Sequence, residues 1–502
     1  MTNATSIFAS SLWISPPLAP PVPTSPARAQ FSALEGWLSS TPVLHLPLHL
    51  VEQQQEHKGR ELLRLLLQTH VQMRGDGDLG PGLQVTTGTV TSLYNHRRLQ
   101  RRTLTTIFGP IHIDRIGYGR HGVASVHPLD QTMQLPARSY SYELQKRLVK
   151  AAVQGPFGES TERILEGTGQ AIPKRSLQEI VQEAATDFDA FYEQRSPELS
   201  LPSASILVVA VDCKGIPMVK PVPPAPTARR RKGEKSNRKK MATVAAVFTR
   251  QPWVRTPVDV VASLFRSGAG AKPNASQPPP PRPENKRIWA SLVKGKEAVI
   301  DEVVQEVQRR DPAAVKTHVA LTDGERALQI LVGNKLKVTL ILDLLHVLEK
   351  VWKAAYVFHP EGSPDAELYA RLMALRILEG NVGQVVKGLR QTVTKRKLFG
   401  TQRKTLLAVA EYFFRNRHRM RYDEYLALGL PIASGSVEGA CKNLIKDRME
   451  RSGMRWTPSM AEAVVKLRAI YLSGDFDAYW DFYILQDQAR LYPAGWWAVV
   501  VK

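Results

Sequence analysis

The chain has 502 residues, and its 68 Lys and Arg against 46 Asp and Glu leave a formal net charge of +22. This excess favours a polyanionic partner, and nucleic acid is the first candidate because each neutralised phosphate releases counterions. We expect no membrane partner and a cytoplasmic, nucleoid-associated protein, since the sequence lacks both a secretion signal and an apolar run of about 18 residues. Cys213 and Cys441 are too few for a disulfide framework or a cysteine zinc cluster.

Proline content and charge divide the start of the chain. Residues 1–46, with six prolines between positions 16 and 26, are expected to form a flexible arm. Residues 47–138 are expected to hold a polar helix from Leu48 to Gln72 and then a basic β-rich segment. In that segment Thr103–Tyr118 alternates as a strand pair around a Gly-Pro turn. Four arginines just before the pair fit either a solvated face or a nucleic-acid contact: Arg97, Arg98, Arg101 and Arg102.

Residues 139–200 have the pattern of consecutive helices. A helix over Glu159–Glu166, a glycine-containing turn and a second helix that begins near Pro173 are typical of a helix-turn-helix. The first residues of the second helix enter the major groove in that motif, which predicts DNA contacts from Lys174, Arg175 and Gln178. The alternative is a plain helical pair joined by a glycine turn.

An α/β domain is expected to begin at residue 201 and to run to residue 343. The apolar, β-branched run Ser205–Val211 predicts a strand that is buried on both faces and ends at Asp212. After a turn at Lys214–Gly215, two further strands are expected: Ile216–Lys220 and Met241–Thr249.

Two Pro-rich or basic loops, 221–240 and 267–286, are expected to interrupt this domain. The first loop holds cations with almost no acid, so we expect it to stay disordered until it meets an anion. Its predicted DNA-binding residues are Arg229, Arg230, Arg231, Lys232, Lys239 and Lys240.

The rest of this domain is expected to bring in further acids. A helix over Ile288–Arg309 should precede a strand, Thr317–Leu321, that leads to Asp323. The next predicted strand, Val338–Leu342, ends on Asp343, and His346 follows about one helical turn later. His346 lies on an apolar helix face, where a histidine is more often a core residue than a metal ligand.

A third acid, Glu438, stands just inside an expected helix start in the phrase Ser-Gly-Ser-Val-Glu-Gly. Lys442 and Lys446 follow at four-residue spacing on the same helix face. Trp456 fits equally a platform for an unpaired base or a core residue. The basic and aromatic residues predicted to contact DNA here are Lys442, Lys446, Arg448, Arg455 and Trp456.

Two strand-terminal acids joined by a distant glutamate suit a two-metal site. Mg²⁺ prefers oxygen ligands. Two Mg²⁺ ions about 4 Å apart can activate a nucleophile and stabilise the leaving oxygen of a phosphodiester. Each acid alone would more often be structural. By residue pattern alone, Asp323 and Asp343 are equal candidates for the second ligand.

The three acids, 111 and 115 positions apart, resemble those of the DDE transposases of bacterial insertion sequences. The Asp-Leu-Leu-His step at 343–346 and the Ser-Gly-Ser-Val-Glu…Ser-Gly-Met-Arg-Trp phrase at 434–456 share that resemblance. Within those enzymes the chain is most similar to the ISKra type, which is related to the Mutator-like superfamily. The likeness runs from about residue 97 to about residue 470.

The resemblance implies an α/β fold: a ribonuclease H-like catalytic core interrupted by an all-helical insertion, after an N-terminal β-rich and helix-turn-helix-like DNA-binding region. The insertion would be 344–432, the core would return with the Glu-bearing helix over 433–475, and 476–502 would be a C-terminal tail. It also implies metal binding by Asp212, Asp323 and Glu438, with Mg²⁺ or substituting Mn²⁺. Asp343 and His346 would not bind the metal themselves but would lie next to its ligands and help to position them.

The implied function is a mobile-element transposase that binds the terminal inverted repeats of its insertion sequence, cleaves at the ends and joins them to target DNA. Its partner would be double-stranded DNA. Because two ends are processed together, a homodimer or larger assembly is expected. Two alternatives remain, a ribonuclease H-like nuclease without strand transfer and an inactive DNA-binding relative.

Overall fold

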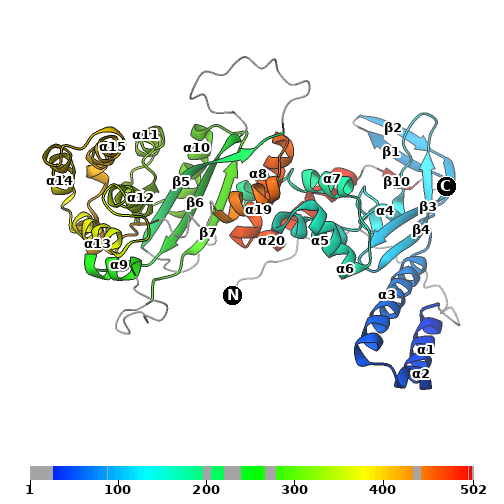
Figure 1. The fold of residues 1–502 in the computed structure, drawn as a ribbon. Coiled ribbons are helices and arrows are strands. Elements are labelled where there is room, and N and C mark those ends of the chain that lie inside the picture. The colour runs from blue at the N-terminus through cyan, green and yellow to red at the C-terminus, as the bar shows by residue number, and fades with distance from the viewer. Residues whose placement is uncertain are drawn as a thin grey trace, which may run out of the picture. The chain divides into compact units, whose positions relative to one another are not determined.

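The computed structural model describes residues 26–87, 89–195, 205–219, 239–265, 279–433, 442–493, 495 and 497–499. The chain divides into two compact units, drawn in Figure 1. Unit 1 comprises 1–152, 157–180 and 480–502, and unit 2 comprises 153–156 and 181–479. No helix among the described residues is long and apolar enough to cross a membrane.

Unit 1 combines helices with two small antiparallel sheets. The expected strand pair is confirmed: β3 (His96–Thr106) and β4 (Gly109–Gly119) pair along their whole length. The expected long helix is α3 (Leu48–Met73), and its Val71 packs against Leu104, Ile111 and Ile113 of the hairpin. The other elements that lie wholly or partly in this unit are α1 (Pro26–Leu38), α2 (Thr41–Leu44), β1 (Leu83–Thr87), β2 (Val90–Tyr94), α4 (Pro128–Thr132), α5 (Tyr142–Gln154), α6 (Phe157–Thr168) and α7 (Lys174–Ala184).

Both ends of this unit differ from the prediction. The expected flexible arm contains helices from Pro26 to Leu44, and the residues before Pro26 lie outside the described part of the chain. The expected C-terminal tail instead forms α20 (Phe476–Leu491) and β10 (Trp497–Val499). Because β10 pairs antiparallel with β1, the end of the chain completes a three-stranded sheet begun near residue 83.

Unit 2 is built on a mixed five-stranded sheet in the order β7-β6-β5-β8-β9, which confirms the expected α/β class. Strand β6 is antiparallel to both of its neighbours, β5 and β7, whereas β8 and β9 run parallel to β5. The central strands are apolar because both of their faces are covered. The strands are β5 (Ile206–Pro217), β6 (Lys239–Arg250), β7 (Glu284–Ser291), β8 (Thr317–Thr322) and β9 (Thr339–Leu342).

Two strand predictions in this sheet are wrong. The chain does not turn at Lys214–Gly215, because β5 continues to Pro217 and stays paired with β6 along its whole length. The helix expected from Ile288 to Arg309 begins only at Lys296, since residues 284–291 form β7 at the edge of the sheet. Pairing with β6, which no local pattern reveals, holds both segments in the extended conformation.

Helices surround and follow this sheet. Residues 344–432 were predicted to be almost wholly helical, and helices do fill most of this range up to Ala427; Figure 1 labels α12, α13, α14 and α15 among them. Helix α10 contacts β6, and α19 packs along β7. The helices that lie wholly or partly in unit 2 are α8 (Phe188–Gln194), α9 (Pro257–Leu264), α10 (Lys296–Arg310), α11 (Arg326–Lys335), α12 (Leu344–Ala355), α13 (Pro364–Leu378), α14 (Val382–Lys395), α15 (Gly400–Asn416), η1 (Arg417–Arg419), α16 (Tyr422–Ala427), η2 (Lys442–Lys446), α18 (Asp447–Met449), η3 (Arg451–Gly453) and α19 (Pro458–Ser473).

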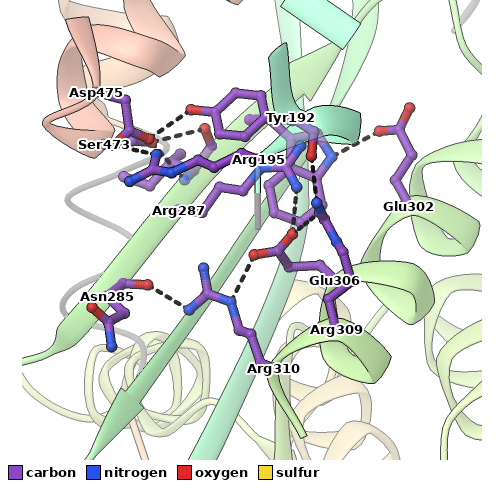
Figure 2. Close-up of polar contacts among 12 residues, drawn as sticks. Tyr192, Arg195, Asn285, Arg287, Glu302, Glu306, Arg309, Arg310, Ser473 and Asp475 are labelled. Carbon is purple, nitrogen blue, oxygen red and sulfur yellow. Dashed lines mark hydrogen bonds and ion pairs between the residues drawn. The ribbon is translucent and has the colours of Figure 1, made fainter. Parts of the chain in front are cut away.

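A buried ionic network fastens α10 to the edge strand β7 (Figure 2). Glu306 of α10 binds Arg287 of β7 and also Arg309 and Arg310 of its own helix. The Arg287 guanidinium lies 3.8 Å from the centroid of the Tyr192 ring. These cations therefore hold the fold together and are not free for an external anion.

Candidate active site

The centre of the candidate site is a pair of aspartates on neighbouring parallel strands. Strands β5 and β8 pair in register up to Val211 and Thr322, so Asp212 and Asp323 occupy the next pair of positions. Adjacent strands lie about 4.8 Å apart, which brings the two backbones together at this edge. Both side chains are half-buried. Although β5 does not end at Asp212, its pairing with β8 does end there.

The two carboxylates share one electrostatic environment. Burial raises the pKa of Asp323, and the negative charge of Asp212 raises it further. The Glu325 backbone N–H, which donates to Asp323 Oδ1 at 3.0 Å, and the nearby His346 act in the opposite direction. Asp212 accepts from the N–H of Cys213 at 2.7 Å. No ion pair of either aspartate occurs among the described residues.

Asp343, in contrast, is buried and caps a helix. Its side chain is 3% exposed and caps α12 by accepting from the Leu345 N–H at 2.8 Å. Its own N–H donates to the carbonyl of Thr322 at 3.0 Å. Because Asp323 rather than Asp343 occupies the position beside Asp212, the structure favours Asp323 as the second acid. His346 is half-buried on the first turn of the same helix.

A lysine that the sequence prediction missed lies beside the aspartate pair. Lys296, at the start of α10, forms an ion pair with Glu325, and this bond raises the pKa of Lys296. The charges of Cys213 and Asp323 raise the same pKa to a lesser degree. No local motif marks Lys296 as a site residue, because only the packing of α10 brings it to this edge.

Aromatic residues of the helical segment support the strand ends that carry the acids. Tyr412 of α15 packs on Gly324, and Tyr422 of α16, which is fully buried, donates to the carbonyl of Leu342 at 2.7 Å. Gln329 connects the two regions by donating to the carbonyl of Asp323 at 2.9 Å and to Asn416 Oδ1 at 3.2 Å. The helices after β9 are therefore part of the scaffold of the site.

The third predicted acid, Glu438, lies outside the described residues. The structure does show where the flanks of its segment are attached. Before it, the carbonyl of Ile432 accepts from the N–H of Leu344, directly after Asp343. After it, the backbone N–H of Trp456 donates to the carbonyl of Pro217, at the end of β5. One flank is thus attached next to Asp343 and the other at the end of β5, five residues beyond Asp212.

The basic phrase after Glu438 divides into buried and exposed residues. Arg448 is 0% exposed and lies with its guanidinium carbon 4.9 Å from the Trp456 ring centroid. Trp456 is 5% exposed and donates its indole N–H to the carbonyl of Met449 at 2.9 Å. Their predicted DNA contacts are therefore wrong for this conformation, because both side chains are already packed in the core. Arg455 and Lys446 are exposed and remain candidates.

The other predicted DNA-binding residues fall into three groups. Arg229, Arg230, Arg231 and Lys232 lie outside the described residues, as does the Lys442 side chain. Lys239 forms an ion pair with Glu450 at 2.6 Å, whereas Lys240 is exposed. In the helical pair α6 and α7, Lys174 and Arg175 are exposed in the first turn of α7, and Gln178 is half-buried. Arg175 forms an ion pair with Glu179 at 3.1 Å, and a DNA-reading role for these three residues stays a prediction.

The arginine cluster of β3 is largely neutralised within unit 1. Arg97 pairs with Asp78 at 3.0 Å, and Arg101 makes two hydrogen bonds to Asp114, at 2.7 and 2.9 Å. Arg102 pairs with the buried Asp130 at 3.0 Å. Three of the four arginines therefore serve the hairpin itself, which favours the structural alternative over nucleic-acid contact.

No three His, Cys, Asp or Glu side chains within the described ranges gather closely enough to hold a metal ion together. The aspartates provide two ligands, and the third predicted ligand, Glu438, is not among the described residues. In comparisons with known proteins, neither a protein-family model nor a curated protein matches this chain.

Proposed function

We propose that the protein is a DDE-type DNA transposase that cleaves the ends of an insertion sequence and joins them to target DNA. The observation that carries this proposal is the pairing of Asp212 with Asp323. Two half-buried carboxylates occupy adjacent register positions, the charge of Asp212 raises the pKa of Asp323, and no ion pair of either aspartate occurs in the described part of the chain. Such a pair suits a site that an external cation completes.

The topology of unit 2 supports a ribonuclease H-like core. In the proposed family the first acid lies on the first strand and the second follows the fourth. Here Asp212 lies in β5, the first strand of the sheet, and Asp323 follows β8, the fourth. The helical segment after β9 takes the place of the proposed insertion, and the chain returns beside Asp343 immediately before the segment that carries Glu438.

The donor set fits a hard divalent cation. Carboxylate oxygens are the ligands that Mg²⁺ takes in phosphoryl-transfer enzymes, and Mn²⁺ accepts the same ligands. Asp212 and Asp323 would hold the ions between them, and Glu438 would complete one coordination shell. When bound, such ions lower the pKa of an attacking water or hydroxyl and stabilise the leaving oxygen.

The chain's own residues would then position the reacting groups. The Glu325 N–H fixes Asp323 Oδ1, and the Cys213 N–H fixes Asp212 Oδ1, so among the described residues each carboxylate keeps its second oxygen for a cation. Asp343 fixes the start of α12 and thereby the position of His346, which lies near Asp323. One site would serve cleavage by water and joining by a 3′-hydroxyl, because both reactions are in-line displacements at a phosphodiester.

The direct test uses DNA that flanks the chain's own gene. A labelled fragment of each flank is incubated with the protein, Mg²⁺ and a target plasmid, and we expect cleaved ends together with plasmid-joined product. Asp323→Asn and Glu438→Gln should each abolish both products, whereas Glu361→Gln, an exposed acid outside the site, should leave them unchanged.

The two rival functions predict different products. Cleavage without joining would identify a ribonuclease H-like nuclease, and binding without cleavage would identify an inactive DNA-binding relative. Cleavage that persists in both site variants would contradict the assignment of these acids. Mass measurement of the complex with two DNA ends should give a homodimer or larger assembly.

A further inference from the structure

Positive charge is concentrated in one part of the helical segment. Residues 382–419, which we call the basic hairpin, contain ten Lys and Arg against a single Glu. Residues 344–381 of the same segment contain four Lys and Arg against five Asp and Glu. Helices α14 and α15 of the basic hairpin pack on each other through apolar side chains, so the cations lie on its outer surfaces. The excess therefore belongs to the basic hairpin rather than to the segment as a whole.

The basic hairpin contains an open pocket of about 440 Å³ between α14 and the end of α15. Its lining includes three cations, Lys387, Arg390 and Arg417, together with the ring of Phe414 and no acidic residue. Phe414 is 41% exposed, so its ring is accessible from solvent.

The Phe414 ring orients both arginines of this pocket. The guanidinium carbon of Arg417 lies 4.3 Å from the ring centroid, and that of Arg390 lies 5.1 Å from it. Arg417 also donates to the carbonyl of Phe414 at 2.7 Å. Stacking on an aromatic ring fixes the plane of a guanidinium and leaves its edge N–H groups available, which suits bidentate binding of phosphate oxygens.

The charge of these arginines is only weakly compensated. Arg390 meets Glu411 at 3.4 Å, but Glu411 is the sole acid of the basic hairpin and binds Arg415 more closely, at 2.6 Å. A single small anion would leave most of the ten cations without a counter-charge. An extended polyanion would instead neutralise the pocket and the surrounding cations together.

We propose that the basic hairpin binds the phosphate backbone of DNA and that the Phe414 pocket receives one backbone phosphate between Arg390 and Arg417. The choice of DNA as the polyanion rests on the proposed function. Because backbone contacts carry little sequence information, this surface should bind all duplexes alike.

The test compares two double variants that remove equal charge. Arg390→Gln with Arg417→Gln empties the pocket of its arginines, whereas Arg371→Gln with Arg376→Gln removes two exposed arginines of α13 in the same helical segment. Binding of a random-sequence duplex is measured by fluorescence anisotropy over a salt series. The pocket variant should bind about 10- to 100-fold more weakly at 0.1 M salt, and its slope of log affinity against log salt should be shallower by about 2. The α13 variant should match the wild type.

A third variant separates orientation from charge. Phe414→Leu keeps every cation and should leave the salt slope unchanged while weakening duplex binding roughly threefold to tenfold, because the guanidiniums lose their stacking surface. Far-ultraviolet circular dichroism of each variant checks that the helices are retained.

Three outcomes would overturn the inference. The pocket variant could bind duplex DNA as tightly as the wild type, while end joining continues; the inference then fails and the proposed function stands. The wild type could fail to bind any duplex, in which case both fail. ADP or pyrophosphate could occupy the pocket of the wild type without displacing duplex, which would identify a small-anion site instead.

Discussion

The ring of Tyr412 closes directly over Gly324, the residue that follows Asp323 in the chain. A Cβ atom at Gly324 would lie 2.7 Å from Tyr412 Oη and closer still to the ring. Tyr412 is itself held from another side by Lys350, whose ammonium lies 5.1 Å from the ring centroid. The helical segment and the turn after β8 are therefore fitted to each other at the residue next to the second acid.

This fit predicts the effect of Gly324→Ala. The added methyl should displace the ring or the turn and destabilise the protein by about 1–3 kcal/mol, with a loss of metal-dependent DNA cleavage. Urea denaturation and the end-cleavage assay measure the two effects. Gly388→Ala in α14 is the matched control, since a Cβ there meets nothing within 4 Å and should be neutral or stabilising. If Tyr412→Ala does not partly rescue Gly324→Ala, the contact is not the cause.

The repulsion between the aspartates predicts an unusual stability change for Asp323→Asn. Asparagine keeps the acceptor for the Glu325 N–H but removes the charge that faces Asp212, so the metal-free variant should melt at a higher temperature than the wild type. Millimolar Mg²⁺ or Mn²⁺ should raise the melting temperature of the wild type and leave that of the variant unchanged. Differential scanning calorimetry measures both effects, with Glu361→Gln as the control. A variant that is less stable without metal would contradict the electrostatic account.

His127 predicts a pH dependence in unit 1. Burial, together with the charges of Arg115 and Arg102, lowers the pKa of His127 from 6.5 to about 4. Between pH 6.5 and about 4 the imidazole is protonated in the unfolded chain but neutral in the folded chain. The free energy of unfolding should therefore decrease as the pH falls from 6.5 towards 4. An NMR titration of the imidazole should give a midpoint near 4, and His127→Gln should remove this part of the pH dependence. A midpoint near 6.5 would show that the ring is open to solvent.

Trp456 and Arg455 predict opposite results at adjacent positions. Trp456→Phe removes the N–H that satisfies the Met449 carbonyl and should cost about 1–3 kcal/mol of stability with no change in duplex affinity. Arg455→Gln removes an exposed charge and should weaken duplex binding without changing the unfolding midpoint. Denaturation and anisotropy on both variants decide the matter. If the Trp456→Phe variant were fully stable but bound DNA more weakly, Trp456 would instead be a stacking platform for a DNA base.

The sequence predicted those features that depend on local pattern. Apolar β-branched runs located the central strands β5, β6 and β8, and periodicity located α3 and the helices after β9. Strand-terminal position identified Asp212, Asp323 and Asp343 as candidates, the family resemblance favoured Asp323, and the parallel register places Asp323 beside Asp212.

What the sequence missed depends on partners far away in the chain. Lys214–Gly215 resembles a turn, yet β6 keeps it extended; residues 476–502 resemble a tail, yet β10 pairs with β1. The residue pattern left Trp456 open between a stacking platform and a core residue, and its contacts with the end of β5 and with Met449 decide for the core. The basic hairpin was overlooked although its signal, ten cations against one acid over residues 382–419, is present in composition alone.

The central claim is that Asp212, Asp323 and Glu438 converge on bound divalent cations. Iron-mediated cleavage of the polypeptide tests it directly: Fe²⁺ replaces Mg²⁺, and ascorbate with peroxide then cuts the backbone beside the bound metal. We expect cuts close to residues 212, 323 and 438 that excess Mg²⁺ suppresses and that Asp323→Asn removes. Cuts confined to other segments, or cuts at 212 and 323 without one near 438, would contradict it.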